Sequence, residues 1–438
     1  MTARASIAPS ISGFRESTMS DTARRGATIF IFVTVLIDML TFGMIGPVLP
    51  KLIAGFVGND YAHAAEIIGL FATAWALMQF FCSPLLGMLS DRVGRRPVIL
   101  LSNAVTAVDY AIMALAPNLW WLFAGRVLSG IATANMTAAS AYIADVTPPE
   151  KRAAAFGMIG SAFGLGFMLG PAIGGLVGTI NPRFTFWAAA GFALLNTLYG
   201  LFVLPESLPR ERRTPQLEWR RANPVGSLKL LRSHQELWGL SWVNFITYVA
   251  HEVFPNVWVI YCIAAFGWST GSVGLTLALV GAVSAVNQAT MVGPVVKRLG
   301  ERKTLLASLL VAVAGLLLLG TNNGIVFLIG AVAIALPMYQ ASSQALMTRR
   351  VGAAEQGELQ GALGSLRGIS MLIGPSIFTL TFAQFAGPWR SLGLIGAPWL
   401  LAALFYTVSL AIAWRVTSRA DDVVLPTPEP MPPIYAES

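Results

Sequence analysis

Apolar stretches long enough to cross a lipid bilayer dominate this sequence of 438 residues. A membrane-spanning helix needs about 20 mainly apolar residues, and twelve stretches reach that length. Six lie at residues 27–50, 66–89, 97–116, 119–143, 154–179 and 184–204, and six at 237–265, 271–296, 304–320, 323–348, 358–384 and 392–414. The sequence therefore predicts an all-α membrane protein with twelve transmembrane helices.

The chain is also poor in charge. Asp, Glu, Lys and Arg make up 11% of its residues and hydrophobic residues 55%, whereas a soluble domain has about 25% charged residues. The net charge of +8 does not indicate a nucleic-acid partner, because the basic residues fall in short groups between apolar stretches. Cys82 and Cys262 lie within apolar stretches, so we expect neither a disulfide nor a bound metal. Membrane lipids are the expected surroundings.

The distribution of Lys and Arg predicts how the chain crosses the membrane. With the N-terminus in the cytoplasm, most basic residues fall in cytoplasmic segments, in agreement with the positive-inside rule. The exceptions are Lys51, Arg183 and Arg390 on the other side, and Arg126 and Arg367 within apolar stretches. We therefore expect a multi-pass protein of the cell inner membrane with both termini in the cytoplasm.

A segment rich in Arg and Pro, at residues 205–236, divides the apolar stretches into two sets of six. We expect five parts: a cytoplasmic tail at 1–26, a six-helix bundle at 27–204, a cytoplasmic linker at 205–236, a second six-helix bundle at 237–416 and a disordered cytoplasmic tail at 417–438. The last of these is expected to be disordered because it is rich in proline.

The two halves repeat each other in sequence. Residues 87–96, GMLSDRVGRR, follow the second apolar stretch, and residues 293–302, GPVVKRLGER, follow the eighth, 206 residues later. Gly170-Pro171 likewise recurs as Gly374-Pro375, 204 residues later. Parallel repeats predict two pseudo-symmetric six-helix bundles related by an axis along the membrane normal, with a substrate cavity between them.

The loop after the second apolar stretch contains Gly87, Asp91, Arg92, Gly94, Arg95 and Arg96. In this spacing it matches the full signature loop of the major facilitator superfamily, which the chain resembles from its first helix to its last. More narrowly, the chain is similar to the drug:proton antiporters related to tetracycline efflux proteins. The resemblance implies the major facilitator fold.

This loop is suited to form a latch at the cytoplasmic ends of helices. Gly87 allows close helix approach and Gly94 a tight turn, while Asp91 and the arginines can form charge-assisted hydrogen bonds. We expect a gate that is held by these bonds in one conformation and released in the other. A loop that only sets the orientation of the chain in the membrane is the alternative.

The fifth apolar stretch carries a glycine-rich motif made of Gly157, Gly166, Gly170, Pro171, Gly174 and Gly175. Three of the glycines are spaced four residues apart and line one helix face, which favours tight helix packing, and Pro171 is expected to bend the helix. In the families that the chain resembles, this motif marks antiporters. A plain contact between helices is the alternative.

Arg126 in the fourth apolar stretch predicts a buried charged site. Its segment, Gly125-Arg126-Val-Leu-Ser-Gly130, is similar to one that places an arginine near the proton site of related transporters. An arginine in hydrocarbon costs about 3 kcal/mol by insertion measures, so Arg126 needs an acidic partner or a water-filled cavity. The candidate partners are Asp38, Asp109, Asp145 and Glu252.

Asp38 is the first candidate for proton coupling, because residues 37–50 match the first helix of tetracycline-type exporters. A carboxylate facing a low-dielectric cavity can bind and release a proton near neutral pH, and a cationic substrate would compete with that proton. Gln79 and Asp109 stand where the resembling exporters have a polar and a charged residue. The alternatives are a structural role for Asp38 and a packing or folding role for Asp109.

The second half departs from the tetracycline exporters. Their histidine in the eighth helix and aspartate in the ninth correspond to Ser284 and Val313, although Gln288 keeps the family's glutamine. His251 and Glu252 in the seventh stretch are the candidates to replace that proton site, because histidine titrates near physiological pH; alternatively, both face a periplasmic vestibule. Arg367 either pairs with Glu252 or extends to the membrane interface.

The expected function is proton-coupled export of amphipathic small molecules, tetracycline-like among them, by a monomer. The candidates to line a substrate cavity are Phe42, Trp75, Trp258, Tyr261, Tyr339 and Gln340, with packing or interfacial anchoring as the alternative for the aromatic residues. A proton-coupled symporter or facilitator of a metabolite is the alternative function. The sequence holds no catalytic constellation and no GxxxxGK[ST] loop, so we expect neither an enzyme nor a cofactor, with the proton gradient as energy source.

Overall fold

The computed structural model describes residues 21–418, with gaps at 134–135, 149–150, 215–230, 232–234 and 353–354. The first half contains α1 (Asp21–Ile45), α2 (Leu49–Phe56), α3 (Tyr61–Val93), α4 (Arg95–Leu115), α5 (Leu119–Ala132), α6 (Met136–Val146), α7 (Arg152–Ile180) and α8 (Pro182–Val203). The second half contains α10 (Gln235–His251), α11 (Val253–Phe266), α12 (Thr270–Thr290), α13 (Val292–Leu319), α14 (Gly324–Ile334), α15 (Tyr339–Thr348), α16 (Gln356–Ala386) and α17 (Ala397–Thr417). Most of the expected linker and both expected tails lie outside the described residues.

The described residues contain eleven helical segments that are long and apolar enough to cross a membrane. The remaining predicted stretch, 119–143, is formed by α5 and α6, which lie on either side of the gap at 134–135. The prediction of an all-helical membrane protein with twelve spans is therefore confirmed.

Helix ends differ from the apolar stretches where local chemistry overrides hydropathy. The second span begins at Tyr61 and not at residue 66, because Asp60 caps the helix by accepting hydrogen bonds from the backbone N–H groups of Ala62 and His63, at 3.0 and 3.1 Å. The first span is interrupted after Ile45, where Pro47 lacks a backbone donor, and α2 then continues it to Phe56.

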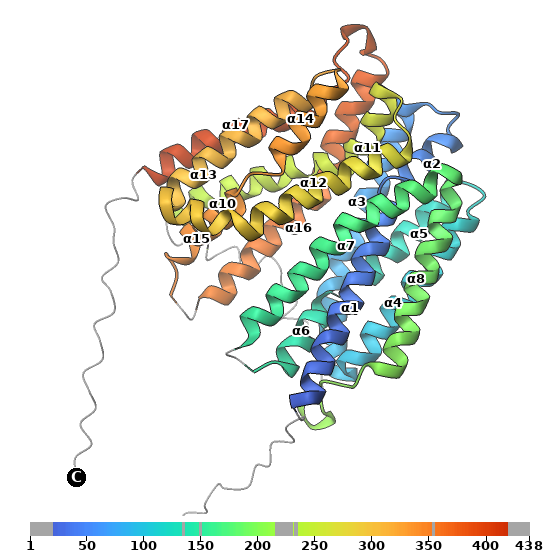
Figure 1. Cartoon of the computed structure of the whole chain (residues 1–438), viewed down its shortest axis with the longest axis vertical. Helices are drawn as coiled ribbons and strands as arrows, with labels where there is room; N and C mark the ends of the chain where they lie inside the picture. Colours follow the sequence, from blue (N-terminus) through green and yellow to red (C-terminus); the bar gives the residue numbers. More distant parts are fainter. Residues whose placement is uncertain are drawn as a thin grey trace, which may run out of the picture.

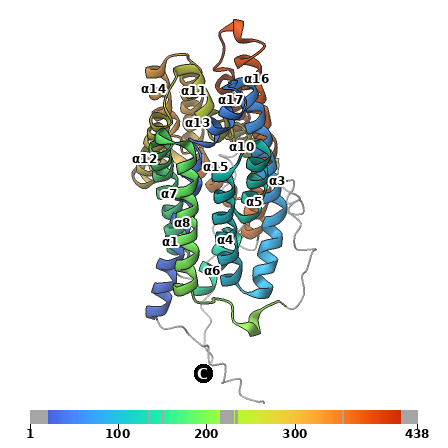
Figure 2. The same cartoon turned by 90° about the vertical axis from the view of Figure 1, so that its right-hand side faces the viewer.

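The two halves contact each other mainly through α7 with α12 and α3 with α16, and α11 also contacts α3 and α2. The Thr73 and Ser376 hydroxyls are 3.1 Å apart across the α3–α16 pair, and Gly281 packs against Met168 across the α7–α12 pair. In Figure 1 the ribbons of the two halves converge near α2 and α11 and diverge towards α6 and α15. The start of α1 and the end of α17 lie at the diverging ends, and Figure 2 shows the helices of both halves running along one common direction.

The internal repeat is visible in the backbone of the two corresponding loops. Gly94 and Gly300 both have positive φ, at 112° and 77°, with ψ of 158° and 162°. An L side chain rarely adopts this conformation, so both halves require glycine at this turn. The next residue forms an ion pair in each half, but the charges are exchanged: Arg95 pairs with Asp145 at 3.2 Å, and Glu301 with Arg349 at 2.7 Å.

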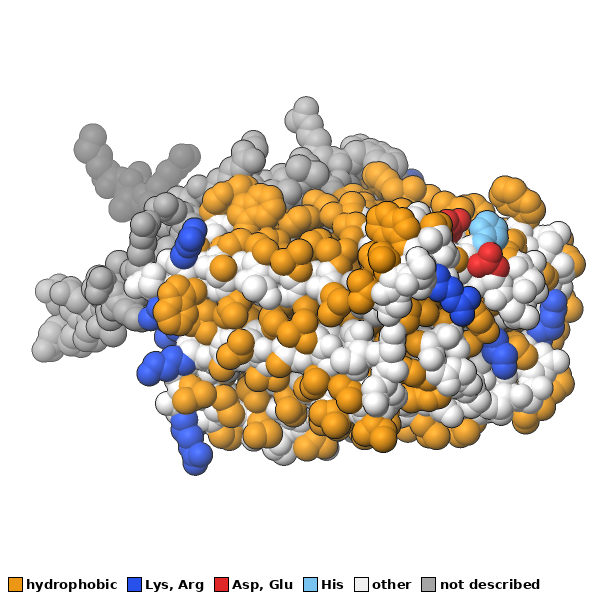
Figure 3. All heavy atoms as spheres, turned by 90° about the horizontal axis from the view of Figure 1, so that it is seen from above, with side chains coloured by type: hydrophobic (Ala, Val, Ile, Leu, Met, Phe, Trp, Pro, Cys, Tyr) orange, Lys and Arg blue, Asp and Glu red, His pale blue; other side chains and the backbone are white. Residues whose placement is uncertain are grey.

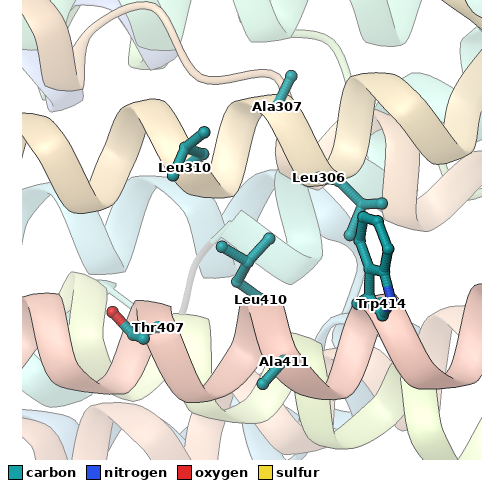
Figure 4. A pocket seen from close by; sticks show the side chains of 7 residues that line it. All are labelled: Leu306, Ala307, Leu310, Thr407, Leu410, Ala411 and Trp414. Carbon is teal, nitrogen blue, oxygen red and sulfur yellow. The ribbon is translucent and has the colours of Figure 1, made fainter.

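The outer surface is largely hydrophobic. Figure 3 shows a broad hydrophobic face with Lys and Arg side chains towards both ends of the molecule, accompanied at one end by acidic and His side chains. A hollow of about 410 Å³ between α13 and α17 is lined by apolar groups of Leu306, Ala307, Leu310, Thr407, Leu410, Ala411 and Trp414 (Figure 4). Such a surface is unfavourable in water and suits a chain surrounded by lipid.

Candidate proton-coupling and substrate site

Asp38 is held in one orientation by a polar partner inside the first half. Its helix, α1, packs against α8, and Asn196 of α8 donates its amide N–H to Asp38 Oδ1 at 2.8 Å and to the Thr34 carbonyl at 3.2 Å. Asp38 is half-buried, whereas Asn196 is fully buried. Sequence analysis missed Asn196, although an asparagine in the middle of an apolar stretch is a usable signal.

Asp109 is an acidic electrostatic neighbour of Arg126, but the ion pairs of the described residues do not include the two, so no Asp109 oxygen lies within 4.0 Å of the guanidinium. Asp109 on α4 is fully buried and Arg126 on α5 is 9% exposed, and the two side chains attract each other electrostatically. Gly125 allows the approach of the two helices, because a Cβ atom there would lie 2.8 Å from Asp109 Oδ1. Asp109 also lies beside Ser129, but within the described part of the chain neither of its oxygens has a partner in hydrogen-bond geometry.

These side chains lie in one region, which we call the N-half cluster: Asp38, Asn196, Tyr110, Asp109 and Arg126. Tyr110 connects its two parts, since it is an electrostatic neighbour of Asp38, Asp109 and Arg126. The structure therefore brings together Asp38, Asp109 and Arg126, which the sequence proposed as separate candidates.

Aromatic side chains of α1 and α3 border this cluster. The Arg126 guanidinium lies 5.6 Å from the centre of the Trp75 ring, within the range of a cation–π interaction. The Phe42 ring lies 5.7 Å from Trp75. Gln79, one turn further along α3, is half-buried. Phe42 and Trp75 thus lie beside the charged groups, and their role as cavity residues stays a prediction.

The signature loop is tied together by ion pairs within the first half. Arg95 contacts Asp91 at 2.5 Å and Asp145 at 3.2 Å, and its guanidinium also donates to Ser90 Oγ at 2.7 Å. Asp145, a candidate partner for Arg126, belongs instead to this loop, because the end of α6 lies beside the start of α4. That earlier candidate assignment was wrong.

Two further contacts fasten the loop to the last turn of α8 and to the segment that follows it. Glu206 Oε1 accepts the backbone N–H of Arg95 at 2.8 Å, which caps the start of α4. Arg96 donates to the Leu201 carbonyl at 2.7 Å, while Arg92 is exposed. Gly87 leaves room for a side chain, since the nearest atom to a Cβ there, Thr137 Oγ1, is 3.9 Å away. Glu206 was missed by sequence analysis, because it lies far from the loop along the chain.

The glycine motif of α7 packs directly on α1. A Cβ atom at Gly166 would lie 2.7 Å from the Leu36 carbonyl oxygen, and one at Gly170 would lie 2.8 Å from Gly43 Cα. Gly174 packs against the backbone of Met44, also on α1. This face of the motif therefore forms the close helix contact that spacing alone suggested.

Other members of the motif have different surroundings. Gly175 faces the second half, where a Cβ atom would lie 3.0 Å from Gly274 Cα on α12. The Pro171 ring lies close to Gly43. A Cβ atom at Gly157 would meet no described atom within 4 Å. The motif thus joins α7 both to α1 and to the opposite half.

His251 and Glu252 lie at a break between α10 and α11. Asn256 donates to the Glu252 carbonyl at 2.8 Å and to Glu252 Oε2 at 3.3 Å, and Gly374 of α16 packs against the Glu252 side chain. His251 is exposed beside the Phe254 ring. The two side chains therefore have separate surroundings, and no hydrogen bond between them is found among the described residues.

Arg367 does not form the expected ion pair with Glu252. It is an electrostatic neighbour of Glu252 and His251, but the described residues include no acidic side chain within 4.0 Å of its guanidinium. Arg367 instead lines a cavity of about 260 Å³ together with the expected residue Gln340. The other polar residues of this cavity were not identified from the sequence.

Three aromatic residues expected at the cavity are packing residues. Trp258 and Tyr261 are fully buried and contact Phe327 and Trp399, because α11 lies against α16 and α17 and not along open space. Tyr339 is buried, with its hydroxyl 2.8 Å from that of Tyr406.

Gln288 lies near the end of α12, and its side chain is exposed. Its neighbour Asn287 is buried and donates to the Leu336 carbonyl at 2.8 Å. Ser284, at the position of the family's histidine, donates to the Ala335 carbonyl at 3.4 Å. This part of α12 is therefore tied to the end of α14 by neutral hydrogen bonds.

The arrangement of two helical halves around buried charges agrees with comparisons to known proteins. The family model described as Major Facilitator Superfamily matches residues 31–286 and 240–433. The chain belongs to the major facilitator superfamily. The predicted family and fold are thereby confirmed, and the chain is a multi-pass membrane protein of a transporter family.

Several relatives of this superfamily member are named tetracycline resistance proteins. It is 39% identical over 401 residues to the class C tetracycline resistance protein of Escherichia coli, covering 90% of this chain and 98% of that protein. It is 38% identical to the class G tetracycline resistance protein of Vibrio anguillarum, covering 89% and 98%. The more specific resemblance expected from the sequence is also confirmed.

Solved structures of other facilitators share the fold at low sequence identity. A bacterial homologue of the human lysosomal transporter Spinster matches with a TM-score of 0.75 at 16% identity, covering 93% of this chain and all of that one. The human organic anion transporter MFSD10 matches with a TM-score of 0.64 at 24% identity, covering 89% and 99%. These likenesses support the fold alone.

Proposed function

We propose that this facilitator is a proton-coupled antiporter that exports amphipathic small molecules, tetracycline among them, across the inner membrane. The observation that carries this proposal is the N-half cluster, in which the half-buried carboxylate Asp38 and the buried charged residues Asp109 and Arg126 are all electrostatic neighbours of Tyr110. The names of the relatives favour export over the alternative of a symporter or facilitator for a metabolite.

In this mechanism Asp38 exchanges a proton for a cationic group of the substrate. The Asn196 amide holds one carboxylate oxygen at 2.8 Å, so the carboxylate keeps a fixed position whichever partner it binds. A proton neutralises Asp38 and removes its attraction for a cation, whereas a bound cation disfavours protonation. Because the two cannot be bound together with full affinity, movement of a proton inward is coupled to movement of a substrate outward.

Alternating access arises from the two halves moving against each other. We place the signature loop and both termini in the cytoplasm, as the positive-inside rule predicts. The halves then touch through α3–α16 and α7–α12 and diverge towards the cytoplasm (Figure 1), which is an inward-open arrangement. Closure on the cytoplasmic side would bring the Asp91–Arg95–Asp145 group towards the second half, where it serves as the latch.

Within the second half, Glu252 and His251 are proposed to contribute a second titratable site. Glu252 sits at the α10–α11 break beside α16, where helix movement would change its surroundings. We further propose that a monomer carries out the exchange, since each chain contains both halves. Gln79, Gln288 and Gln340 are proposed to contribute polar contacts to substrate or to the proton route.

The function is tested with inverted membrane vesicles from a host that lacks its own drug pumps. An imposed pH gradient should drive tetracycline accumulation in vesicles that contain this protein, and dissipation of the gradient should stop it. Asp38→Asn should abolish the accumulation at equal protein amount, because the amide cannot carry the exchanged proton.

The matched control is Asp60→Asn, since Asp60 is an exposed helix cap and asparagine caps equally well. This variant should transport normally. Normal exchange by Asp38→Asn would remove Asp38 from the mechanism, and an absence of gradient-driven transport by the wild type across a broad compound set would refute the export proposal.

A further inference from the structure

A polar cavity of about 260 Å³ lies in the second half, formed by helices that do not contribute to the N-half cluster. Its polar lining consists of Asn244 and Tyr248 on α10, Gln340 and Gln344 on α15, and Gln360 and Arg367 on α16. Polar and ionisable side chains within membrane spans are costly and usually mark a pathway or a binding site. A concentration of four amides, a phenol and a guanidinium therefore requires a reason.

Three of the four amides of this cavity are held in place by contacts with each other or with the helices behind them. Gln344 donates to Gln360 Oε1 at 3.1 Å, which connects α15 to α16. The buried Asn244 donates to Ser343 Oγ at 2.9 Å and to the Leu240 carbonyl at 3.0 Å. The lining is thus preformed, and it does not depend on a ligand to assemble it.

Arg367 is the charged group of the cavity. Its side chain is exposed to the cavity, and in the described parts of the chain no carboxylate lies within 4.0 Å of it. Glu252 is an electrostatic neighbour of Arg367, but its carboxylate accepts a hydrogen bond from Asn256 and it does not line the cavity. The N–H donors of the Arg367 guanidinium are therefore available to a group bound in the cavity.

We propose that this cavity binds an oxyanion group of the exported molecule, a carboxylate or an enolate, with Arg367 as its counter-ion. This inference rests on the proposed export function and adds the chemical class that the second half recognises. A planar guanidinium offers paired N–H donors that match a planar oxyanion. Tyr248 and the glutamine amides can donate to the same group.

The size of the cavity indicates that it holds one substituent and not a whole substrate. Pockets for drug-sized ligands have volumes of about 300–1,000 Å³, above the 260 Å³ found here. The rest of the molecule would extend towards the first half, where Asp38 attracts cations and Phe42 and Trp75 offer aromatic surface. The favoured substrates are therefore amphipathic zwitterions whose opposite charges are recognised by opposite halves.

The test uses two dyes that differ only in an oxyanion group. Rhodamine B carries a carboxylate, and its ethyl ester does not. Binding of each dye to the full-length protein in lipid nanodiscs is measured by fluorescence polarisation. The wild type should bind rhodamine B more tightly than the ester. Arg367→Gln should raise the Kd for rhodamine B about tenfold or more, because hydrogen bonds to charged groups are lost, and should leave the Kd for the ester within about twofold.

Two further variants sharpen the result. Arg367→Lys keeps the charge but not the paired donors, so its Kd for rhodamine B should be intermediate. Arg415→Gln removes an exposed arginine at the end of α17, outside the cavity, and should change neither Kd. Unchanged binding of the ester by Arg367→Gln also shows that this variant is folded.

Failure of the wild type to prefer rhodamine B, including failure to bind either dye, would overturn the inference. An equal loss of both dyes in Arg367→Gln would overturn it as well. A separate measurement of tetracycline export by the wild type distinguishes failure of the oxyanion site from failure of the proposed export function. Normal gradient-driven export without dye discrimination removes only the oxyanion site, whereas no export of any compound removes the proposed function.

Discussion

The buried residues Asp109 and Arg126 give the sharpest prediction about what holds the first half together. Asp109 is fully buried, Arg126 is 9% exposed, and the two are electrostatic neighbours without a direct ion pair, so we expect each to offset part of the other's charge. Removing one partner of a buried pair costs about 3–5 kcal/mol, because an uncompensated charge remains. Because Asp109 and Arg126 are not in direct contact, Asp109→Asn and Arg126→Gln should each lower the free energy of unfolding by less than this, about 1–3 kcal/mol.

The double variant should lose less than the sum of the two single variants. With both charges removed, no uncompensated charge is left behind, so we expect a coupling of about 0.5–2 kcal/mol. Arg126→Gln should be the more damaging single change, because it also removes the cation–π contact with Trp75, which contributes up to about 2 kcal/mol in a desolvated setting.

The assay is equilibrium unfolding of purified protein in mixed micelles of dodecyl maltoside and sodium dodecyl sulfate, followed by far-ultraviolet circular dichroism. Asp60→Asn is the matched control and should change the free energy of unfolding by less than about 0.5 kcal/mol, since it alters a surface cap. Strict additivity of the single variants would show that Asp109 does not compensate Arg126, and the description of the cluster would then be wrong.

Three further outcomes are expected. Gly174→Ala should lower the free energy of unfolding by about 1–3 kcal/mol, because its Cβ atom would overlap the α1 backbone, whereas Gly157→Ala, with open space around it, should be neutral or slightly stabilising; equal effects would contradict the packing. Glu252→Gln should change the proton:substrate stoichiometry or its pH dependence in vesicles, and if both are unchanged, Glu252 is not a proton site. Arg95→Gln should lower the export rate at saturating tetracycline without changing the tetracycline Kd, because it frees Asp91 and Asp145 far from the substrate site; a weakened Kd would argue against a purely gating role.

Much of the architecture could be predicted from the sequence because lipid imposes a simple rule. Every spanning segment must satisfy its own backbone hydrogen bonds, so apolar stretches of sufficient length become helices. The repeated segments at 87–96 and 293–302 likewise predicted equivalent turns, and Gly94 and Gly300 do share a positive φ. The two ion pairs Arg95–Asp145 and Glu301–Arg349, in which the basic and acidic positions are swapped, were not predicted. The repeated segments contain Arg95 and Glu301 but not their partners.

The candidate site was predicted less completely. Arg126 was expected to need an acidic partner or water because an arginine in hydrocarbon has a high free-energy cost. The same reasoning limited the candidate partners to the few acidic residues in or beside apolar stretches. The partner's identity did not follow from it, because hydropathy does not show which helices pack beside α5 or which of their faces are turned towards Arg126. The same limit applies to Asn196, Glu206 and the amides around Arg367, whose partners lie on distant parts of the chain.

The sequence by itself determined that this chain spans a membrane as two related sets of helices, and it marked which polar residues must find partners there. Only the tertiary structure decided which partner each one has. Hydropathy and spacing constrain a helix along its own axis, whereas the rotation and depth of neighbouring helices depend on side chains that pack against each other from far apart in the sequence. For that reason Asp38 meets Asn196, Arg126 lies near Asp109, and Arg367 faces a cavity and not Glu252.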